Sequence, residues 1–546
     1  MSRREAWLSA GLVFAVALAV RLWAAAQVPF GIPEDTTYYW GVARNLAEGR
    51  GLVSDTIWSY ATAARDPVTG AFGFFFPRPA FEIWLPLPSL LGVLPMLATG
   101  STTYAATTIV PVLLGALVPV LAWRIAADLA EERGLGFERA RTLALGAGLA
   151  AALWLPLVLP SALLDSTIAF GLPALIACAL MVRLARRPPD RLVDGRLIGL
   201  GLSIGAAGLA RNEAVWVGLA WALIAWAALR GRGLGNVVRA VAVPAVVAVA
   251  VMAPWLVHNW LVFGNPLPGQ AITNAFSLTG FDIFAWNEPP TLARYLAAGP
   301  QAWVSHRVDG FRHNFLSVLM VPGFPVSLVG LLGLLVVGRA RALRPLLLVA
   351  LLTFWITTLA FPVATTWGTF LHASVPAHVL LLVAAVAGLD AGLARVGRWR
   401  GWTRPVAWLG PMFAALGAIL FTTLGIPAYG SLAAGTEARY ADVLGRIEQA
   451  GLPIDGSRPI IANHPMWVSE VARLSALALP DETPADVVDL AAAFGAEIVI
   501  IDGEHGAWPA VLDEAGPGAA CFVPVDLEPP GDGRPDPFRV FRVACP

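Results

Sequence analysis

The sequence predicts an α-helical polytopic membrane protein that carries a small α/β domain at its C-terminal end. Apolar residues make up 57% of the 546 residues, charged residues only 14%, and the mean hydropathy is +0.68. Soluble domains carry about 25% charged residues, so most of this chain is suited to a bilayer. After residue 429 the long apolar runs give way to short β-branched segments that alternate with helical ones. We therefore expect a transmembrane domain over residues 1–429 and an α/β domain over residues 430–546.

Apolar length and charged breaks predict about eleven transmembrane helices, and roughly ten to twelve are compatible with the pattern. The first follows Arg3 and Arg4 and contains no small-residue cleavage site, so we interpret it as an uncleaved anchor. The predicted spans lie near residues 6–28, 102–123, 142–158, 166–184, 197–210, 214–230, 238–257, 318–338, 345–361, 370–389 and 405–427.

Arginines cluster in every second connection between the predicted spans, in residues 124–141, 183–196, 230–239, 339–344 and 395–404. Because cytoplasmic loops carry an excess of basic residues, this alternation places the N-terminus and these loops in the cytoplasm. An odd number of spans then places the α/β domain outside, together with two long loops, residues 29–101 and 258–317. We expect a multi-pass protein of a plasma membrane, such as the bacterial inner membrane, with its active site on the extracytoplasmic side.

Composition and motifs also exclude several classes of partner. The formal net charge is zero, which argues against a nucleic-acid partner. The cytoplasmic loops contain no Gly-rich phosphate cradle and no dinucleotide fingerprint, so a nucleotide-sugar donor is not expected. No His, Cys and acidic residues share metal-ligand spacing, and we expect neither a metal nor another cofactor.

The segment from Pro29 to Asp55 follows the first span and abruptly carries acids, tyrosines and an Arg-Asn pair. A carboxylate where a membrane helix ends stays ionised at little cost and can meet both aqueous and lipid-borne reactants. Helix-spaced positions from Tyr39 to Leu46 predict a short amphipathic helix on the membrane surface. Asp35 lies at its leading end, and Arg44 is four residues before Glu48, the spacing of an ion pair. Asp35 is either a helix N-cap or a functional carboxylate, and spacing alone leaves both interpretations open.

Asp165 opens the fourth predicted span at its outer end, where Asp is favoured as an N-cap and an active-site role is the alternative. Arg211 lies in the outer connection between the fifth and sixth spans. Its guanidinium suits phosphate binding, but Glu213, two residues away, is an equally good ion-pair partner. His372 starts the tenth span near His378, and a hydrogen-bonded helix-end histidine is favoured over a substrate contact.

The first outer loop carries Asp-x-x-x-Tyr, from Asp35 to Tyr39, and then Ala-Arg-Asn-Leu-Ala-x-Gly, from Ala43 to Gly49. This pattern resembles the first outer loop of the GT-C glycosyltransferases. The similar groups are protein O-mannosyltransferases, aminoarabinose transferases of lipid A and Rgt-type lipopolysaccharide sugar transferases. The segment Pro-Trp-x-x-His-Asn around His258 is similar to a Pro-Trp-x-x-Arg-Asn segment of the same family.

The resemblance implies a GT-C fold and an inverting, metal-independent transferase. It would move a monosaccharide from a polyprenyl-phosphate donor to a protein, lipid or glycan acceptor. Asp35 would be the general base, with Thr36 standing where the family usually has Glu. Asp165 would be a second carboxylate that orients the acceptor or tunes Asp35.

The resemblance also implies a set of substrate-binding side chains. Arg78 lies where the family often has His-Pro-Pro, and Arg211 matches a Lys or Arg position, so both would hold the phosphate. The remaining candidates are His258, Tyr39, Arg44 and His372. We expect the two acids, Arg78 and Arg211 to converge on one outer cavity.

Two functions from other classes remain open. A lipid-sugar flippase or polytopic transporter would need charges buried midway along spans, whereas the strongest charges here lie at outer helix ends. An oligosaccharide ligase acting on a diphosphate-linked donor would be supported by a metal-binding acidic pair in the first loop. Asp35 is instead followed by Thr36 and Thr37.

The tail is expected to consist of alternating strands and helices, including one helix over residues 465–480. Acceptor recognition and lid-like support are both possible roles for it. Cys521 and Cys545 flank two β-rich stretches joined by a turn, so a disulfide between them is expected outside the cytoplasm. Two free thiols are the alternative, and Cys178 is expected to be a buried thiol in the fourth span.

Overall fold

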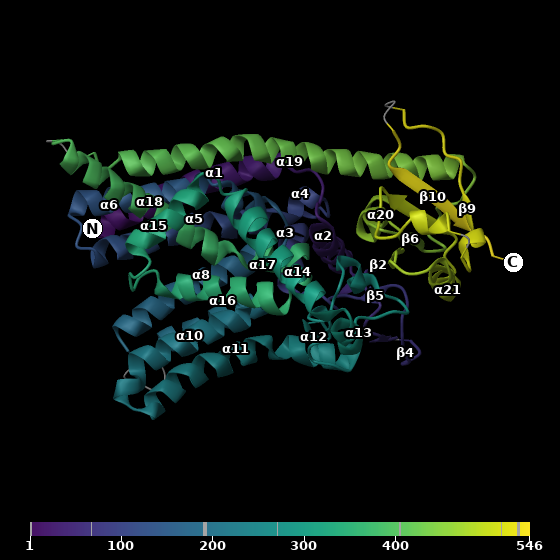
Figure 1. Cartoon of the computed structure of the whole chain (residues 1–546), viewed down its shortest axis with the longest axis horizontal. Coiled ribbons are helices and arrows are strands. Elements are labelled where there is room, and N and C mark those ends of the chain that lie inside the picture. The colour runs from purple at the N-terminus through teal and green to yellow at the C-terminus, as the bar shows by residue number, and fades with distance from the viewer. Residues whose placement is uncertain are drawn as a thin grey trace.

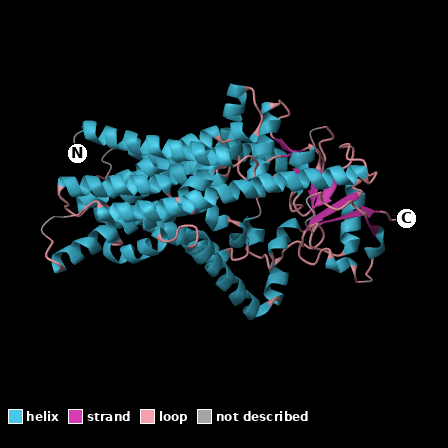
Figure 2. Ribbon diagram, turned by 90° about the horizontal axis from the view of Figure 1, so that it is seen from above, coloured by secondary structure: helices cyan, strands magenta, loops and turns pink. Residues whose placement is uncertain are grey.

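The computed structural model describes residues 3–66, 68–188, 194–269, 271–402, 406–514, 516–531 and 535–545. Of the arginines used to orient the chain, Arg191 and Arg404 lie outside these ranges. Long helices form an elongated bundle, and the tail domain lies at the end opposite the N-terminus (Figures 1 and 2). The outer-loop elements lie between the bundle and the tail domain (Figure 1).

Each predicted span overlaps a helix. These helices are α1 (Arg3–Gln27), α5 (Ile109–Glu132), α6 (Phe137–Leu153), α8 (Ser166–Arg186), α9 (Gly195–Gly208), α10 (Ala214–Leu229), α11 (Leu234–Phe263), α15 (Val326–Val337), α16 (Arg344–Ala360), α18 (Val375–Trp399) and α19 (Leu409–Gln449). Within the described ranges, seven helical stretches are long and apolar enough to cross a membrane, or eight if the bent pair after α6 is one span. The chain is therefore a multi-pass membrane protein, and the count of eleven spans stays a prediction.

The bent pair explains how the chain reaches the start of α8. The helix breaks by 71° after α6 and continues as α7 (Leu155–Val158) and η1 (Leu159–Ala162). Pro156 supplies no backbone N–H to continue the ladder. Fully buried Arg21 of α1 satisfies carbonyls freed by the break, donating to Ala152 at 3.2 Å and Leu157 at 3.0 Å. The break thus brings η1 and the residues that precede α8 against α1.

The first outer loop folds over the end of the bundle. Its elements are α2 (Glu34–Ala47), β1 (Val53–Ser54), β2 (Thr56–Ile57), β3 (Ala64–Arg65), β4 (Phe72–Gly73), β5 (Arg78–Pro79), α3 (Leu87–Thr99) and α4 (Tyr104–Thr107). Most of α2 is buried between α3 and the tail domain, so the predicted surface helix exists but does not lie exposed on the membrane.

The second outer loop and the connection before α18 consist of short helices. They are α12 (Ala271–Asn274), η3 (Gly280–Phe284), α13 (Leu292–Ala297), α14 (Gly299–Arg312), the π-helix η4 (His313–Met320), η5 (Ala364–Trp367) and α17 (Thr369–Ala373). On the opposite side of the bundle, η2 (Arg230–Arg232) joins α10 to α11.

The tail domain contains a sheet with the strand order β2-β7-β6-β8-β10-β9. Its own elements are β6 (Ile460–Ala462), α20 (Pro465–Ala472), β7 (Ala476–Ala478), α21 (Pro484–Phe494), β8 (Ile498–Asp502), η6 (Ala510–Leu512), η7 (Ala519–Cys521), β9 (Phe522–Pro524) and β10 (Phe538–Val543). The edge strand β2 belongs to the first outer loop and pairs in parallel with β7. The sheet therefore joins two segments that lie more than four hundred residues apart.

Two expectations about the tail need correction. The predicted helix over residues 465–480 ends at Ala472, because Arg473 has a left-handed φ of 59° and the next residues form β7. The predicted boundary after residue 429 falls inside α19, which runs unbroken for 41 residues. Buried Tyr440, Val443 and Ile447 pack the last turns of α19 on the tail sheet.

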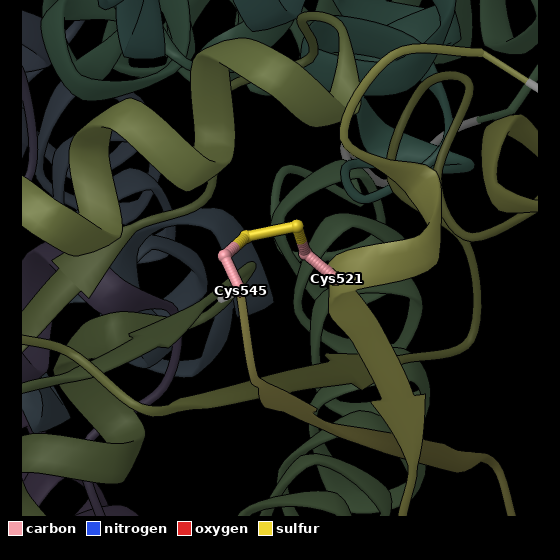
Figure 3. The surroundings of a disulfide bond; sticks show 2 residues. All are labelled: Cys521 and Cys545. Carbon is pink, nitrogen blue, oxygen red and sulfur yellow. A yellow bond between two sulfur atoms is a disulfide. The ribbon is translucent and has the colours of Figure 1, made fainter.

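The predicted disulfide is confirmed (Figure 3). Cys521 and Cys545 are bonded with a Cα–Cα distance of 4.7 Å, at the ends of the antiparallel pair β9 and β10. Cys178 is a free, buried cysteine on α8, as expected.

Candidate active site

A cavity of about 390 Å³ lies where the first outer loop meets the outer ends of the helices. Its walls come from α2, the connection between α9 and α10, the end of α16, and the segment η5–α17. The charged side chains among its lining residues are those of Asp35, Arg211, Glu213 and His372. Val215 at the start of α10 also lines it and is 63% exposed.

His372 links the two acids that the sequence singled out. Its Nε2 lies 3.3 Å from Asp35 Oδ2, and its Nδ1 lies 3.7 Å from Asp165 Oδ2. The Thr167 hydroxyl donates to Asp165 at 3.1 Å and lies 2.9 Å from His372 Nδ1. With the hydroxyl proton directed at Asp165, both ring nitrogens face acceptors, which is the hydrogen-bonding pattern of a protonated imidazole.

Asp35 faces the cavity, and Asp165 lies behind His372. The side chain of Asp35 is 22% exposed and lines the cavity, whereas that of Asp165 is 6% exposed and does not. Pro33 is the N-cap of α2 and makes no side-chain cap, so the capping interpretation of Asp35 is wrong. Asp165 does cap α8, accepting from Thr167 N at 2.7 Å, and it contacts the ring of His372 from the same position. The favoured capping interpretation of Asp165 is therefore confirmed, and its active-site role stays a prediction.

The two carboxylates control the charge of His372. Burial lowers the pKa of this histidine, but the carboxylates of Asp165 and Asp35 outweigh burial and raise the pKa to about 9. His372 lies on α17, before α18 begins its span, so its ring is outside the membrane-crossing helices. At neutral pH the imidazolium thus lies between two anionic oxygens.

This arrangement predicts a titration that can be measured. The raised pKa means that His372 contributes stability fully below its unfolded value of about 6.5, and this contribution is lost as pH rises towards about 9. Asp165→Asn removes one carboxylate, so the pKa of His372 should fall towards the unfolded value. NMR of 13C-labelled histidines in nanodiscs, assigned with His372→Gln, should show one resonance titrating near pH 9 that moves to lower pH in Asp165→Asn. Absence of any histidine titrating above about pH 8 would contradict the bridged arrangement.

Arg211 is the other cationic side chain that lines the cavity. It forms a bidentate pair with Glu213, with Nε–Oε2 at 2.9 Å and Nη2–Oε1 at 3.0 Å, so the predicted ion pair exists. Its Nη1 donates to Ser166 Oγ at 3.1 Å, which ties it to the start of α8. Since Arg211 still lines the cavity, pairing with Glu213 does not remove it from a ligand's reach.

Tyr39 lies on α2 one helical turn after Asp35 and also lines the cavity. Burial and the charge of Asp35 raise the pKa of Tyr39 well above its usual value. The phenol is therefore a neutral hydrogen-bonding group at any working pH. Tyr39 therefore lies beside Asp35 and Ser166, and its contact with a substrate stays a prediction.

The structure does not bring Arg78 to the cavity, so the expected convergence fails for this residue. Arg78 is buried in the first outer loop, where it pairs with Glu82 at 2.8 Å, stacks on Phe74 and donates to two backbone carbonyls. Four of its five N–H donors are engaged inside the loop, which holds the guanidinium away from the residues that line the cavity. The short spacing between Arg78 and Glu82 is the sequence signal for this pair.

Arg44 and His258 also lie away from the cavity lining. Arg44 pairs with Glu470 of the tail domain and lies 4.0 Å from Asp55, so the predicted pair with Glu48 is wrong. A contact with a residue 426 positions later cannot be found by helix spacing. His258 stacks on Trp255 of the same helix, with 4.6 Å between ring centroids.

Sequence reasoning missed the aromatic wall of the cavity and one polar group. Trp58, Trp84, Trp216 and Trp367 line it, together with Asn212, and they come from four separate segments. The only sign of this wall in the sequence was the aromatic content of 10%, part of which lies in the two long loops predicted outside the membrane. Side chains of this kind offer stacking surfaces for sugar rings and apolar surface for lipid.

Within the described ranges, no group of three or more His, Cys, Asp and Glu side chains is placed to hold a metal ion. The acids around His372 show why, since they contact different nitrogens of one ring and so lie on different sides of it. A shared ion would need them to converge on one point.

Comparison with known proteins gives the fold. No protein-family model matches the sequence, and no curated protein matches it. ArnT from Cupriavidus metallidurans, in its crystal structure bound to undecaprenyl phosphate, aligns over 99% of both chains with 14% identity and a TM-score of 0.56. ArnT in the apo state aligns over 100% of both chains with 14% identity and a TM-score of 0.53.

The apo crystal structure of the Archaeoglobus fulgidus oligosaccharyltransferase is also similar. It aligns over 96% of this chain and 73% of its own, with 14% identity and a TM-score of 0.53. Similarity at this identity establishes the fold and leaves activity to the site. The predicted fold class is thereby confirmed: the chain shares the fold of ArnT, with a C-terminal domain built on a sheet.

Proposed function

We propose that this protein is an inverting, metal-independent glycosyltransferase that uses a polyprenyl-phosphate monosaccharide as donor. The observation that carries the proposal is Asp35, held at 3.3 Å by His372 and facing a cavity that Arg211 also lines. Transfer needs a base for the acceptor's proton and a cation for the leaving phosphate on either side of one anomeric carbon. We assign these two roles to Asp35 and Arg211.

The reaction follows from these positions. The acceptor hydroxyl attacks the anomeric carbon from the side of Asp35, and its proton passes to the Asp35 carboxylate. The bond between the anomeric carbon and the phosphate oxygen breaks, its electron pair leaves with polyprenyl phosphate, and the configuration inverts. The extra negative charge develops beside Arg211 and Asn212. His372, charged and backed by Asp165, holds Asp35 in one orientation before the attack.

The charges of the cavity favour a monophosphate over a diphosphate. Its lining carries two acids, Asp35 and Glu213, against Arg211 and the imidazolium of His372. His372 is engaged by the acids, so Arg211 is the cation left for the donor, and Glu213 already shares it. A diphosphate would add a second anionic group with no matching cation in the lining, which is costly in a partly desolvated site.

A lipid-borne donor is supported by the shape and lining of the cavity. Val215 and Phe361 extend the apolar wall to the outer ends of α10 and α16, where a polyprenyl chain can enter from the bilayer. The tryptophans offer stacking surface for the sugar. We propose that chemistry occurs on the extracytoplasmic side of a plasma membrane, with a protein, lipid or glycan as acceptor.

The sidedness makes a separate prediction. The arginine-rich connections and the disulfide of the tail both favour a cytoplasmic N-terminus and an extracytoplasmic tail. Alkaline phosphatase fused after Pro546 should therefore be active, and a fusion at Arg187 should be inactive. An inactive C-terminal fusion together with an active one at Arg187 would invert the topology and place Asp35 in the cytoplasm.

The test of the proposed function uses the full chain in proteoliposomes. A panel of undecaprenyl-phosphate monosaccharides is supplied with an envelope extract as acceptor pool, and released undecaprenyl phosphate is measured by mass spectrometry. Release that depends on both the extract and one sugar supports the proposal. Release from none of these donors would overturn it, and so would transfer from the matching undecaprenyl-diphosphate sugars, supplied in a parallel set, where the monophosphates give none.

A further inference from the structure

The tail sheet has the strand order that opens a ligand-binding crevice in open α/β folds. β7, β6 and β8 are parallel neighbours in that order, and the chain leaves β6 through α20 and β7 through α21. Val468 of α20 packs with Ile498 and Ile500, whereas Val487 of α21 packs with Val499 and Ile501, so the helices cover opposite faces. Such a reversal opens a crevice at the carboxyl ends of the two strands at the switch, here β6 and β8.

At the carboxyl end of β6 lies a side chain of the first outer loop. Glu34 Oε2 lies 3.1 Å from His464 Nδ1, directly after β6, and Glu34 Oε1 accepts from Met466 N at 3.2 Å, in the first turn of α20. A carboxylate at a helix N-terminus is stabilised by free N–H groups and the helix dipole. The tail therefore binds the residue next to Asp35 as an anionic ligand.

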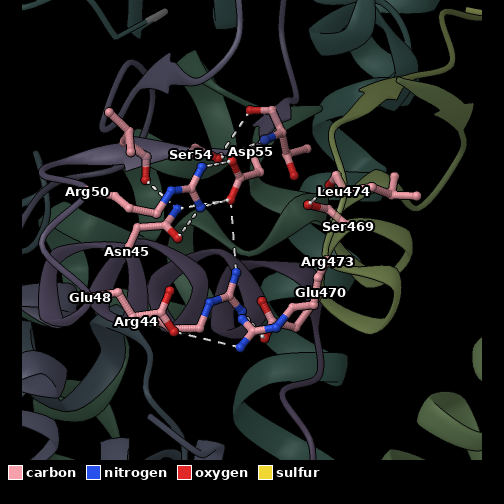
Figure 4. Close-up of polar contacts among 12 residues, drawn as sticks. Arg44, Asn45, Glu48, Arg50, Ser54, Asp55, Ser469, Glu470, Arg473 and Leu474 are labelled. Atoms are coloured by element: carbon pink, nitrogen blue, oxygen red, sulfur yellow. Dashed lines mark hydrogen bonds and ion pairs between the residues drawn. The ribbon is translucent and has the colours of Figure 1, made fainter. Parts of the chain in front are cut away.

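A second contact holds the other end of α2. Arg44 forms a buried ion pair with Glu470 of α20, with side-chain exposures of 4% and 6% (Figure 4). Asp55, which precedes β2, lies 4.0 Å from Arg44 and is held by Arg50 at 2.6 Å (Figure 4). Burial raises the pKa of Glu470 to about 6, although the charge of Arg44 acts to lower it. The fold therefore keeps this acid against Arg44 even though burial opposes its ionisation.

We infer that the tail domain is a positioning device for Asp35, and that Glu34 and Arg44 are the positioning residues it holds. α2 is 14 residues long, and its two polar anchors on α20 bracket the segment that presents Asp35 and Tyr39 to the cavity. The parallel pairing of β2 with β7 fixes the same loop to the sheet. A displacement of a catalytic group by about 1 Å costs about 100-fold in rate, so an element that carries the base needs such anchors. The contacts of Glu34 and Arg44 with α20 are called the clamp below. The effect on catalysis rests on the proposed role of Asp35, whereas the clamp itself does not.

The test compares Glu34→Gln, His464→Ala and their double variant with Glu48→Gln in the full chain. Glu48 is the matched control, because it lies at the end of the same helix and pairs with Arg473 of the tail at 3.8 Å, in an exposed contact. Hydrogen exchange of residues 34–47 measures the clamp without any transfer assay. Loss of a charge-assisted contact should speed exchange at the start of α2 by roughly 10-fold or more, and Glu48→Gln should leave it unchanged.

The catalytic effect is read separately with the donor found in the proteoliposome panel. We expect kcat to fall about 10-fold in each single variant with KM for the donor unchanged, and the double variant to be no worse than the poorer single one. His464→Asn should restore most of the rate, because its amide can donate where Nδ1 does. Unchanged exchange in both single variants would overturn the clamp, and faster exchange with unchanged kcat would overturn its role in positioning Asp35. A wild-type protein that transfers from no donor would refute the proposed function, and exchange would still decide the clamp.

Discussion

Asp35→Asn should abolish sugar transfer while donor binding is kept. The substitution removes a proton acceptor and changes side-chain volume little, so kcat should fall by about 100- to 10,000-fold, the usual worth of a general base. The amide oxygen of Asn can still face His372 Nε2, so the fold around α2 and α17 should persist. The measurement is single-turnover release of undecaprenyl phosphate, alongside binding of undecaprenyl phosphate to the same preparation.

Asp66→Asn is the matched control for this prediction. Asp66 is an exposed acid of the same outer loop whose Oδ1 accepts from Val68 N and Thr69 N, contacts that Asn can also make. Transfer by this variant should equal that of the wild type. If Asp35→Asn kept more than about a tenth of the rate with a defined acceptor, the assignment of the base would be lost.

Arg211→Ala should weaken binding of undecaprenyl phosphate by about 10- to 100-fold, the loss expected for one charge-assisted contact. The loss has two sources. The phosphate loses its guanidinium partner, and Glu213, which is 6% exposed, is left as an uncompensated buried acid that repels an anionic ligand. The dissociation constant of undecaprenyl phosphate, measured in nanodiscs for both proteins, gives the effect directly.

The Glu213→Gln variant separates phosphate binding from a purely structural ion pair. If Arg211 binds phosphate, releasing it from Glu213 should leave donor binding equal or tighter, and the Arg211→Ala/Glu213→Gln double variant should recover part of the loss. If the pair is only structural, both single variants should weaken binding equally. The second outcome would remove Arg211 from the donor site.

Elements dominated by one-dimensional patterns were predictable from the sequence. Long apolar runs gave rise to a helix in every predicted span, because a segment that buries its backbone in lipid must satisfy its own hydrogen bonds. The disulfide was predictable because two cysteines flank strands that a turn makes antiparallel. Asp35 was found because a carboxylate directly after a membrane span is unusual in composition, and the loop around it resembles a known family.

Partners at long sequence separation were decided only by the tertiary structure. Arg44 and Arg78 look alike in the sequence, yet one is held by Glu470 from the far end of the chain and the other by Glu82 four residues away. A buried charge takes whichever opposite charge the fold brings within reach, and the sequence does not encode that proximity locally. Folding likewise placed His372 between Asp35 and Asp165, although more than 200 residues separate it from either acid. The favoured interpretation of a hydrogen-bonded helix-end histidine is confirmed, but the sequence did not show which acids it would meet. The sequence by itself determined the membrane class, the helices and the first acid, since these depend on composition and local periodicity. Which charges share a cavity depended on packing, because contact energies act through space between segments that only the folded chain brings together.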